Sequence, residues 1–363
     1  MKIGLLYKDC LKKGGYPRDV RWLASSLTRL GHSVIIFCDP GYEKDGLIPI
    51  VRIKLTKELL LKINELDIIH VFSLFIIDHV LIIRKLVNQG IPIVVSNLGQ
   101  LMKFCMQRHR IRKEFYLRLF TSYLKDVTFH VFSPLEEKHV QAYFPSNKTF
   151  IATLGLFPKS RSIPFKNKNS SSPIFLFFGR NDVFQKGIDI LIDAFKYVIN
   201  TKIIGINYQF IIAGNDWKNS RKVINKKLNN YNIQDKVKFL GNIDENIKDK
   251  LLNEASFLIF LSRFDGPPRP IRESIERGTP VIISPETNMG YLISNYNAGI
   301  VTELNITKIG DEIESHINNE EKYFNYCNGV ERLRTYLFWD RVAEDYLTGY
   351  RDVLSNLQTI KKN

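Results

Sequence analysis

The sequence predicts an α/β protein with two doubly wound parallel sheets, and three observations support this fold class. The 363 residues exceed what one hydrophobic core usually serves, so about two domains are expected. Short runs rich in Ile, Val and Phe alternate with longer helical patterns, as in parallel sheets covered by helices on both faces. The alternation breaks once, near Ser160, and then starts again.

The first series of strands and helices runs from the N-terminus to about residue 160. Strands are expected at KIGLLY, HSVIIFC, DIIHVFS, PIVVSN and TFHVFS, with a helix from Pro17 to Leu30 after the first strand. The stretch KSRSIPFKNKNSSSP that follows is polar and rich in Ser, Asn and Lys, as linkers are. We therefore assign residues 1–160 to an N-terminal Rossmann-like domain and residues 161–173 to a linker.

The second series predicts a C-terminal Rossmann-like domain over residues 174–335. Its strands are expected at PIFLFFGR, YQFIIAG, KVKFLG, SFLIFLS and TPVIIS, with a helix from Lys186 to about Ile199. The last stretch, FWDRVAEDYLTGYRDVL, predicts an amphipathic helix within 336–363 that packs back on the first domain. Two such domains would leave a cleft between the carboxyl ends of their sheets, where ligands of these folds bind.

Composition narrows the class of protein. The four cysteines, Cys10, Cys38, Cys105 and Cys327, contain no CxxC pair, which favours a reducing compartment over a disulfide framework or a zinc site. The N-terminal apolar run is too short for a signal peptide, and charged residues interrupt the longest apolar region. We therefore expect a cytoplasmic protein.

The positive charge is concentrated in the first half of the chain. Residues 1–165 hold 25 Lys and Arg against 13 Asp and Glu, whereas the remainder holds 27 against 24, within a total of +15. This asymmetry indicates an anionic partner for the N-terminal half.

A glycine pair follows the first predicted strand. Gly14 and Gly15 stand just before Pro17, a residue suited to the first turn of a helix. A helix that starts this way presents backbone N–H groups to an anion, with no side chain in the way. The alternative is that the two glycines only form a turn.

Two cations begin the second domain. Arg180 directly follows an apolar strand and Lys186 precedes the next helix, so both should emerge at the carboxyl edge of the sheet. The forked guanidinium and the point charge of the ammonium together suit a diphosphate. The alternative is two solvated loop cations.

Two carboxylates stand eight positions apart in the stretch DGPPRPIRE. Asp265 follows the strand that contains Phe257 to Leu261, and Glu273 lies about one turn into the next predicted helix. A carboxylate can accept two hydrogen bonds from a vicinal diol of a ribose or hexose. The alternative is that both acids only pair with arginines of the same stretch, namely Arg269, Arg272 or Arg277.

These motifs occur together in a recognisable order. The glycine pair before a helix that ends LGHSV, then FFGRNDVFQKGIDILIDAF, IIAGND, VKFLGNI, DGPPRPIRESIERGTPVI and FWDRVAEDY resemble the retaining glycosyltransferases of the family 4 type, also called glycosyl transferases group 1. The resemblance spans nearly the whole chain and implies the GT-B fold, with an enzyme of the bacterial surface polysaccharide type. It also implies that the domain at 1–160 binds the acceptor and the domain at 174–335 binds the nucleotide sugar.

The resemblance also implies roles for individual residues. Arg180 and Lys186 match the pair that grips the donor diphosphate, and with Asp265 they form the expected catalytic set. Asp265 replaces the first Glu of the E-x7-E motif and should lie near the transferred sugar. Glu273, the second acid, should hold the nucleotide ribose.

Four glycines complete the expected donor site. Gly15, with its neighbour Gly14, matches the glycine whose backbone approaches the diphosphate from the N-terminal domain. Gly214 lies in IIAGND, and Gly266 follows Asp265.

The chain departs from the family pattern at two places. Pro267 and Pro268 follow Gly266, where many relatives have Phe-Gly, and stiffen the loop beside the sugar. Many relatives carry a His near the end of the fourth N-terminal strand, where this chain has Asn97 and Leu98. The donor is then unusual, or Asn97 takes the place of that His at the acceptor side of the site.

His70, in DIIHVFS, is a second candidate for contact with the acceptor, because it should end a strand that faces the cleft. The alternative is a structural histidine. No His, Asp or Cys cluster has metal-ligand spacing, and the resemblance implies neither a metal nor another cofactor beyond the donor substrate.

We therefore expect a retaining glycosyltransferase that moves a sugar from a nucleoside diphosphate sugar to a hydroxyl of a glycan or lipid-linked glycan in polysaccharide biosynthesis. One alternative is a catalytically silent GT-B protein that binds a glycan or a partner enzyme. The other is a nucleic-acid binder, for which the basic half lacks interleaved aromatic platforms, so we expect no nucleic-acid partner.

The stretch LMKFCMQRHRIRKEFYLRLF carries much of the N-terminal charge. It holds Lys103, Arg108, Arg110, Arg112, Lys113 and Arg118 against Glu114 alone, with Ile111, Phe115 and Leu119 at helical spacing. Such a helix can lie on an anionic membrane, which would place the enzyme peripherally on the cytoplasmic face. The alternatives are a helix whose apolar side enters the core, and a basic groove for a soluble acidic polysaccharide.

Overall fold

The computed structural model describes residues 1–12, 14–39, 50–52, 62–156, 173–201, 208–317 and 319–360. The chain forms two compact units. Unit 1 consists of Met1–Gly155 and Leu337–Asn363, and unit 2 of Leu156–Tyr336. The chain therefore passes from one unit to the other twice. The linker predicted at 161–173 lies outside the described residues, except for Pro173.

Unit 1 is organised around a parallel sheet of seven described strands in the order β3-β2-β1-β4-β5-β6-β7. They are β1 (Lys2–Leu6), β2 (Ser33–Cys38), β3 (Ile50–Arg52), β4 (Ile68–Phe72), β5 (Ile93–Ser96), β6 (Thr128–Val131) and β7 (Thr149–Ile151). β1 pairs in parallel with both β2 and β4, so the winding direction reverses at β1. This reversal is the point where doubly wound sheets bind ligands, at the carboxyl ends of the strands.

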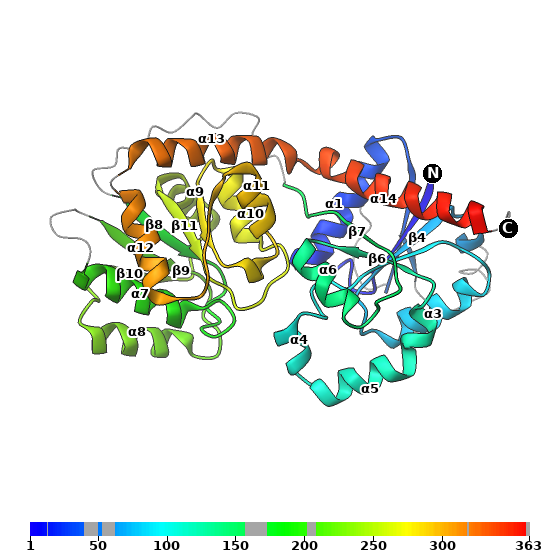
Figure 1. The fold of residues 1–363 in the computed structure, drawn as a ribbon, viewed down its shortest axis with the longest axis horizontal. Helices are drawn as coiled ribbons and strands as arrows, with labels where there is room; N and C mark the ends of the chain where they lie inside the picture. Colours follow the sequence, from blue (N-terminus) through cyan, green and yellow to red (C-terminus); the bar gives the residue numbers. More distant parts are fainter. Residues whose placement is uncertain are drawn as a thin grey trace. The chain divides into compact units, whose positions relative to one another are not determined.

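Unit 1 also contains six α-helices and one 3-10 helix among the residues described. They are α1 (Gly15–Arg29), α3 (Ile77–Val87), α4 (Lys103–Gln107), α5 (Arg110–Phe120), the 3-10 helix η1 (Thr121–Leu124), α6 (Pro134–Gln141) and α14 (Trp339–Ile360). α14 follows unit 2 in the sequence but lies against α1 (Figure 1). Arg29 of α1 forms an ion pair of 2.6 Å with Asp340 of α14. The last long helix is thus part of the first unit.

A buried polar chain connects α14 to the sheet of unit 1. The Tyr350 hydroxyl lies 2.7 Å from His70 Nδ1, and His70 Nε2 lies 2.6 Å from Ser96 Oγ. Ser96 Oγ lies 2.6 Å from His130 Nδ1, and His130 Nε2 lies 2.8 Å from the Ala152 carbonyl. All four polar side chains are inaccessible or nearly so to solvent.

The direction of every hydrogen bond in this chain follows from the final acceptor. The Ala152 carbonyl can only accept, so the proton of neutral His130 is on Nε2 and its Nδ1 accepts from Ser96. Ser96 has one proton to donate, so its oxygen accepts from His70 Nε2, and His70 Nδ1 accepts from Tyr350. Burial lowers the pKa of both histidines, that of His130 to about 3, in agreement with neutral rings.

Unit 2 contains a six-stranded parallel sheet in the order β10-β9-β8-β11-β12-β13 among the residues described. The strands are β8 (Ile174–Phe178), β9 (Gln209–Ala213), β10 (Val237–Gly241), β11 (Phe257–Phe260), β12 (Val281–Ile283) and β13 (Gly299–Val301). The winding direction reverses at β8, which pairs with both β9 and β11. Both sheets agree with the predicted fold class, which is confirmed.

Helices lie on both faces of the second sheet (Figure 1). They are α7 (Ile188–Thr201), α8 (Ser220–Tyr231), α9 (Glu245–Glu254), α10 (Arg269–Glu276), η2 (Pro285–Thr287), α11 (Gly290–Tyr296), α12 (Ile306–Ile317) and α13 (Glu320–Tyr336). α7 contacts α8 and α12, whereas α13 contacts α10 and α11. The loops that follow β8 and β11, at the carboxyl ends of these strands, carry the predicted site.

Candidate functional site

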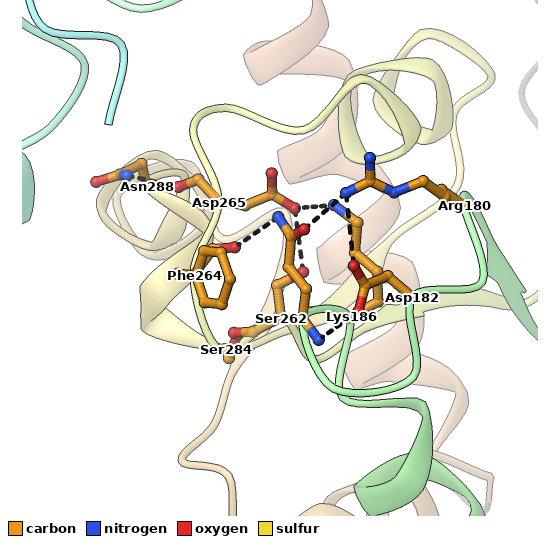
Figure 2. A network of polar contacts seen from close by, with 9 residues as sticks. Arg180, Asp182, Lys186, Ser262, Phe264, Asp265, Ser284 and Asn288 are labelled. Carbon is orange, nitrogen blue, oxygen red and sulfur yellow. Dashed lines mark hydrogen bonds and ion pairs between the residues drawn. The ribbon is translucent and has the colours of Figure 1, made fainter. Parts of the chain in front are cut away.

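The predicted cations and one predicted acid meet at the carboxyl edge of the sheet in unit 2. Arg180 follows β8 and Asp265 follows β11, and these two strands are parallel neighbours. Lys186, two residues before α7, reaches the same place (Figure 2). The fold therefore brings together three side chains that are up to 85 positions apart in sequence, from 180 to 265.

Lys186 and Asp265 form a close ion pair. Lys186 Nζ contacts Asp265 Oδ2, and the Ser262 hydroxyl donates to the same oxygen at 3.1 Å (Figure 2). The two side chains are 11% and 17% exposed, so the pair is partly shielded from water but reachable. Lys186 Nζ also lies 5.1 Å from the centre of the Phe260 ring, within the range of a cation–π contact.

The loop after β12 holds the backbone of Asp265. The Asp265 N–H donates to the Glu286 carbonyl at 2.9 Å, and Asn288 Nδ2 donates to the Asp265 carbonyl at 2.6 Å. Asn288 has a left-handed backbone, with φ of 58°. Gly266, half-buried, is the next residue of the loop that Asn288 fixes. Sequence reasoning missed this contribution, although the polar stretch SPETN directly after a buried strand was a signal for it.

Arg180 is more exposed than Lys186 and is held by different partners. Its Nη2 donates to Gln185 Oε1 at 2.7 Å, and its guanidinium carbon lies 4.4 Å from the centre of the Trp217 ring. The side chain is 43% exposed, and Asp182 lies 3.8 Å away. Arg180 is thus oriented while its remaining N–H groups stay available to an anion.

Glu273 lies in the second turn of α10, as predicted, but it is not alone. Its Oε1 forms an ion pair with Arg269 Nη2 at 2.8 Å and accepts from Lys248 Nζ at 3.0 Å. The pairing with Arg269 is one that the sequence offered as the purely structural alternative. Lys248 comes from α9 and was not predicted at all. Glu273 is 12% exposed.

Gly214 has a structural reason to be glycine. A Cβ at this position would lie 1.6 Å from the Gly179 carbonyl oxygen, and the φ of Gly214 is +140°. The ends of β8 and β9 can therefore approach each other only if this residue has no side chain. Gly214 was predicted to contact the donor, and the structure places it at this close approach of the two strand ends.

The glycine pair of unit 1 lies at the carboxyl end of β1, where α1 begins. Gly14 is the N-cap and supplies no capping side chain, and α1 has no acidic residue in its first turn. Among the described residues, no atom outside the immediate neighbours would come within 4 Å of a Cβ on Gly15. The helix start is therefore open to close approach by an anion.

Asn97 lies after β5 and is fully buried, with its Oδ1 near the Leu101 N–H at 3.4 Å. The next two residues, Leu98 and Gly99, have left-handed backbones. Glu136 holds this turn, because its carboxylate accepts from the Gly99 N–H and the Phe132 N–H, both at 2.6 Å. Burial raises the pKa of Glu136 to about 7 although these bonds act against it.

His70 requires a correction. It does not end a strand but stands in the middle of β4, it is fully buried, and both of its ring nitrogens take part in the chain from Tyr350 to Ala152. This placement corresponds to the structural alternative and leaves no ring atom for an acceptor. No sequence signal connected His70 with Tyr350, which is 280 positions away.

The basic stretch forms α4 and α5, and the apolar side of α5 does not enter the core. Ile111, Phe115 and Leu119 are 83%, 63% and 51% exposed, whereas Leu117 is the buried residue of this helix. Lys113 differs from the other cations, because its Nζ donates to the Cys105 carbonyl at 2.6 Å and burial lowers its pKa.

Metal-binding clusters and membrane-spanning helices are both missing from the described part of the chain. No group of three His, Cys, Asp or Glu side chains there could hold a metal ion. None of the helices described is long and apolar enough to cross a membrane.

The two parallel α/β units match the GT-B fold seen in solved glycosyltransferase structures. Solved structures with this architecture include a sucrose-phosphate synthase from Thermosynechococcus elongatus, with 20% sequence identity and a TM-score of 0.72 over 98% of this chain and 99% of that one. A glycosyltransferase from Rickettsia africae has 17% identity and a TM-score of 0.72, with the same coverage.

A third similar structure is Anabaena HepE in complex with UDP and glucose, with 15% identity and a TM-score of 0.70 over 97% of this chain and 100% of that one. Residues 159–329, nearly the whole of unit 2, match the family model described as Glycosyl transferases group 1. Over these residues the chain is similar to group 1 glycosyl transferases, and it shares its fold with the solved structures. Comparison with curated protein sequences gives no match.

Proposed function

We propose that the protein is a retaining glycosyltransferase that moves a sugar from a nucleoside diphosphate sugar to a hydroxyl of a glycan or lipid-linked glycan in polysaccharide biosynthesis. The observation that carries the donor class is the group formed by Arg180, Lys186 and Asp265 at the carboxyl edge of unit 2. Two cations of different shape suit the two phosphates of a diphosphate. The carboxylate beside them suits the hydroxyls of the sugar.

The leaving group determines what Lys186 contributes. As the bond between the anomeric carbon and the diphosphate oxygen breaks, negative charge grows on that oxygen, and a cation placed there lowers the barrier. A bond forms from the acceptor oxygen to the same face of the anomeric carbon, and the acceptor proton passes to the departing diphosphate oxygen. No protein base is required, so positioning and charge supply the catalysis.

The ion pair with Asp265 supports this role for Lys186. Before the donor binds, Asp265 neutralises the ammonium and keeps it at the strand edge. A diphosphate would bring the ammonium a second, stronger anionic partner, and Asp265 would then be available to the sugar hydroxyls. The open helix start at Gly15 suits a phosphate group. Glu273 would accept from the ribose diol through Oε2, since Oε1 carries the two ion pairs described above.

Similar structures suggest which donors to test first. One of them is HepE in complex with UDP-glucose. Two others are WaaG, a glycosyltransferase involved in lipopolysaccharide biosynthesis, and WaaB, a lipopolysaccharide outer core galactosyltransferase. Uridine diphosphate hexoses and surface glycan acceptors are therefore the first candidates for this chain.

The test is a screen of UDP, GDP and ADP sugars by thermal shift, followed by assays of donor hydrolysis and transfer. A donor at a hundredfold excess over its dissociation constant stabilises the folded protein by about 2.7 kcal/mol. Turnover of at least one donor supports the proposal. Donor binding without hydrolysis or transfer to any glycan acceptor would favour the catalytically silent alternative.

For the acceptor, we propose that it is presented at an anionic membrane by contact with α5. Ile111, Phe115 and Leu119 recur every four residues, so they share one side of the helix, opposite the buried Leu117. Arg112 directly follows Ile111, and Arg118 directly precedes Leu119, so an exposed arginine borders each flank of this apolar side.

An exposed apolar stripe between arginines fits a lipid surface better than a soluble acidic polysaccharide. A polysaccharide would use the cations but leave Ile111 and Phe115 in water, whereas a bilayer interface accepts the apolar side chains and attracts the guanidinium groups. Each Lys or Arg near an anionic leaflet contributes about 1 kcal/mol. Lys113 is excluded from this surface by its contact with the Cys105 carbonyl.

Co-sedimentation of the full chain with phosphatidylcholine vesicles of rising phosphatidylglycerol content tests this proposal. We expect binding that weakens as salt rises, about thirtyfold weaker binding for Arg112→Gln/Arg118→Gln, and a comparable loss for Ile111→Ser/Phe115→Ser. Ile247→Ser in unit 2 is the control, because Ile247 is also exposed, at 44%. A protein that stays in the supernatant at every lipid composition would rule out the membrane.

A further inference from the structure

Lys248 places a buried ammonium beside the proposed ribose site. Lys248 lies in the first turn of α9, whose start Asp244 caps by accepting from the Ile247 N–H at 2.8 Å. The side chain is 5% exposed, and its Nζ lies 5.7 Å from the centre of the Phe178 ring at the end of β8. The charge therefore lies under the carboxyl edge of the sheet, where water can do little to stabilise it.

A buried ammonium needs anionic partners, and Lys248 has two of unequal value. Glu245 Oε2 lies 2.6 Å away, but its side chain is 64% exposed and is well solvated without the contact. Glu273 Oε1 lies 3.0 Å away, and its side chain is 12% exposed. Lys248 and Glu273 therefore form the buried pair, in which each group depends on the other.

The pair also fixes how the Glu273 carboxylate is turned. Both Lys248 and Arg269 contact Oε1, so neither of these two ion pairs involves Oε2. Arg269 reaches Glu273 from the same helix four residues earlier, and its side chain is 38% exposed. Lys248 comes from a different helix and is buried, so it is the contact that sets the carboxylate relative to the sheet.

We propose that Lys248 is a positioning residue that holds the Glu273 carboxylate turned so that Oε2 accepts from the ribose hydroxyls of the donor. The inference rests on the proposed function, because it takes the ribose role of Glu273 as given. It adds to that role a residue on another helix, without which the carboxylate would follow the more exposed Arg269. The chemical group recognised is the vicinal diol of a nucleoside diphosphate.

The test compares a nucleoside diphosphate with its 2′,3′-dideoxy analogue by calorimetry, using whichever of UDP, GDP and ADP binds the wild type most tightly. The wild type should bind the ribose form at least about tenfold more tightly, the value of one hydrogen bond to a charged acceptor. Lys248→Met should reduce this ratio to within about threefold while it changes affinity for the dideoxy form little. A lysine that only supports the fold would lower affinity for both forms equally.

Three variants keep the outcomes separate. Glu245→Gln, which removes the exposed partner only, should retain the wild-type ratio. Glu273→Gln should abolish the ratio; if it does not, the ribose role within the proposed function is wrong. If Glu273→Gln abolishes the ratio and Lys248→Met leaves it intact, only the positioning role is wrong. If Lys248→Met does not fold, Lys248→Arg, which keeps the charge but moves it, serves for the comparison and should also lower the ratio.

Discussion

Tyr350→Phe should destabilise unit 1 by removing a buried hydroxyl, although Tyr350 is far in sequence from the proposed site. The substitution removes the hydroxyl that donates to His70 Nδ1 at 2.7 Å and leaves the ring of the tyrosine in place. His70 is inaccessible to solvent, so its Nδ1 loses this donor and gains no water. An unsatisfied buried acceptor costs about 1 to 3 kcal/mol.

The loss of stability caused by Tyr350→Phe can be measured by urea unfolding. With a slope of about 2 kcal/mol per molar urea, a loss of about 2 kcal/mol lowers the midpoint of the unit 1 transition by about 1 M. The matched control is Tyr143→Phe, which removes the same atom from a tyrosine of unit 1 that is 39% exposed. Its midpoint should stay within about 0.3 M of the wild type, since an exposed hydroxyl stays bonded to water.

The comparison also has a result that would refute the reasoning. If Tyr350→Phe and Tyr143→Phe lower the midpoint equally, the polar chain from Tyr350 to Ala152 does not hold α14 on the sheet. The assignment of donors and acceptors along that chain would then lose its energetic basis.

Three further predictions concern pH, backbone and charge. The folded-state pKa values of His70 and His130 lie below 6.5, so the unfolded chain takes up protons that the folded chain does not. The free energy of unfolding should therefore fall as pH drops below about 6.5, by up to about 1.4 kcal/mol per histidine and pH unit. Denaturation midpoints at pH 7.5 and 5.5 that do not differ would contradict this. Gly214→Ala should destabilise unit 2 by about 3 kcal/mol or more, because its Cβ would meet a carbonyl oxygen. Gly15→Ala should fold normally but weaken donor binding. Equal unfolding midpoints for the two variants would count against this contrast. Lys186→Ala should lower kcat about a hundredfold at saturating donor, and a variant that only raises KM would argue against stabilisation of the leaving group.

The alternation of apolar and helical segments was enough to predict the fold class, because strands buried on both faces leave a strong signal. Boundaries were less accurate. The helix expected from Pro17 begins at Gly15, since Gly14 can serve as N-cap, and the helix expected from Lys186 begins at Ile188. Local sequence does not decide between neighbouring start points when more than one residue can cap the helix.

The site residues that follow neighbouring strands could be predicted from the strand order. Contacts that depend on how the helices are placed could not be predicted. Arg180 and Asp265 follow neighbouring strands, so their proximity followed from the topology. Lys248 of α9 contacts Glu273 of α10 through the tertiary fold, and the spacing of 25 positions in the sequence does not predict that contact. Periodicity likewise found the apolar side of α5 but could not say that no other element of the described fold covers most of it.

The return of α14 to unit 1 affects the order in which the protein can be completed during synthesis. A ribosome that has released residues 1–155 has produced every described strand of the first sheet, but Tyr346 and Tyr350, which close over His70 and His130, are nearly 200 codons away. Unit 2 is contiguous and can fold as soon as it emerges, although it is the second in the sequence. The first half of the nascent chain must therefore wait with part of its apolar and histidine-lined surface uncovered, and a truncated chain that stops before Leu337 would stay in that state.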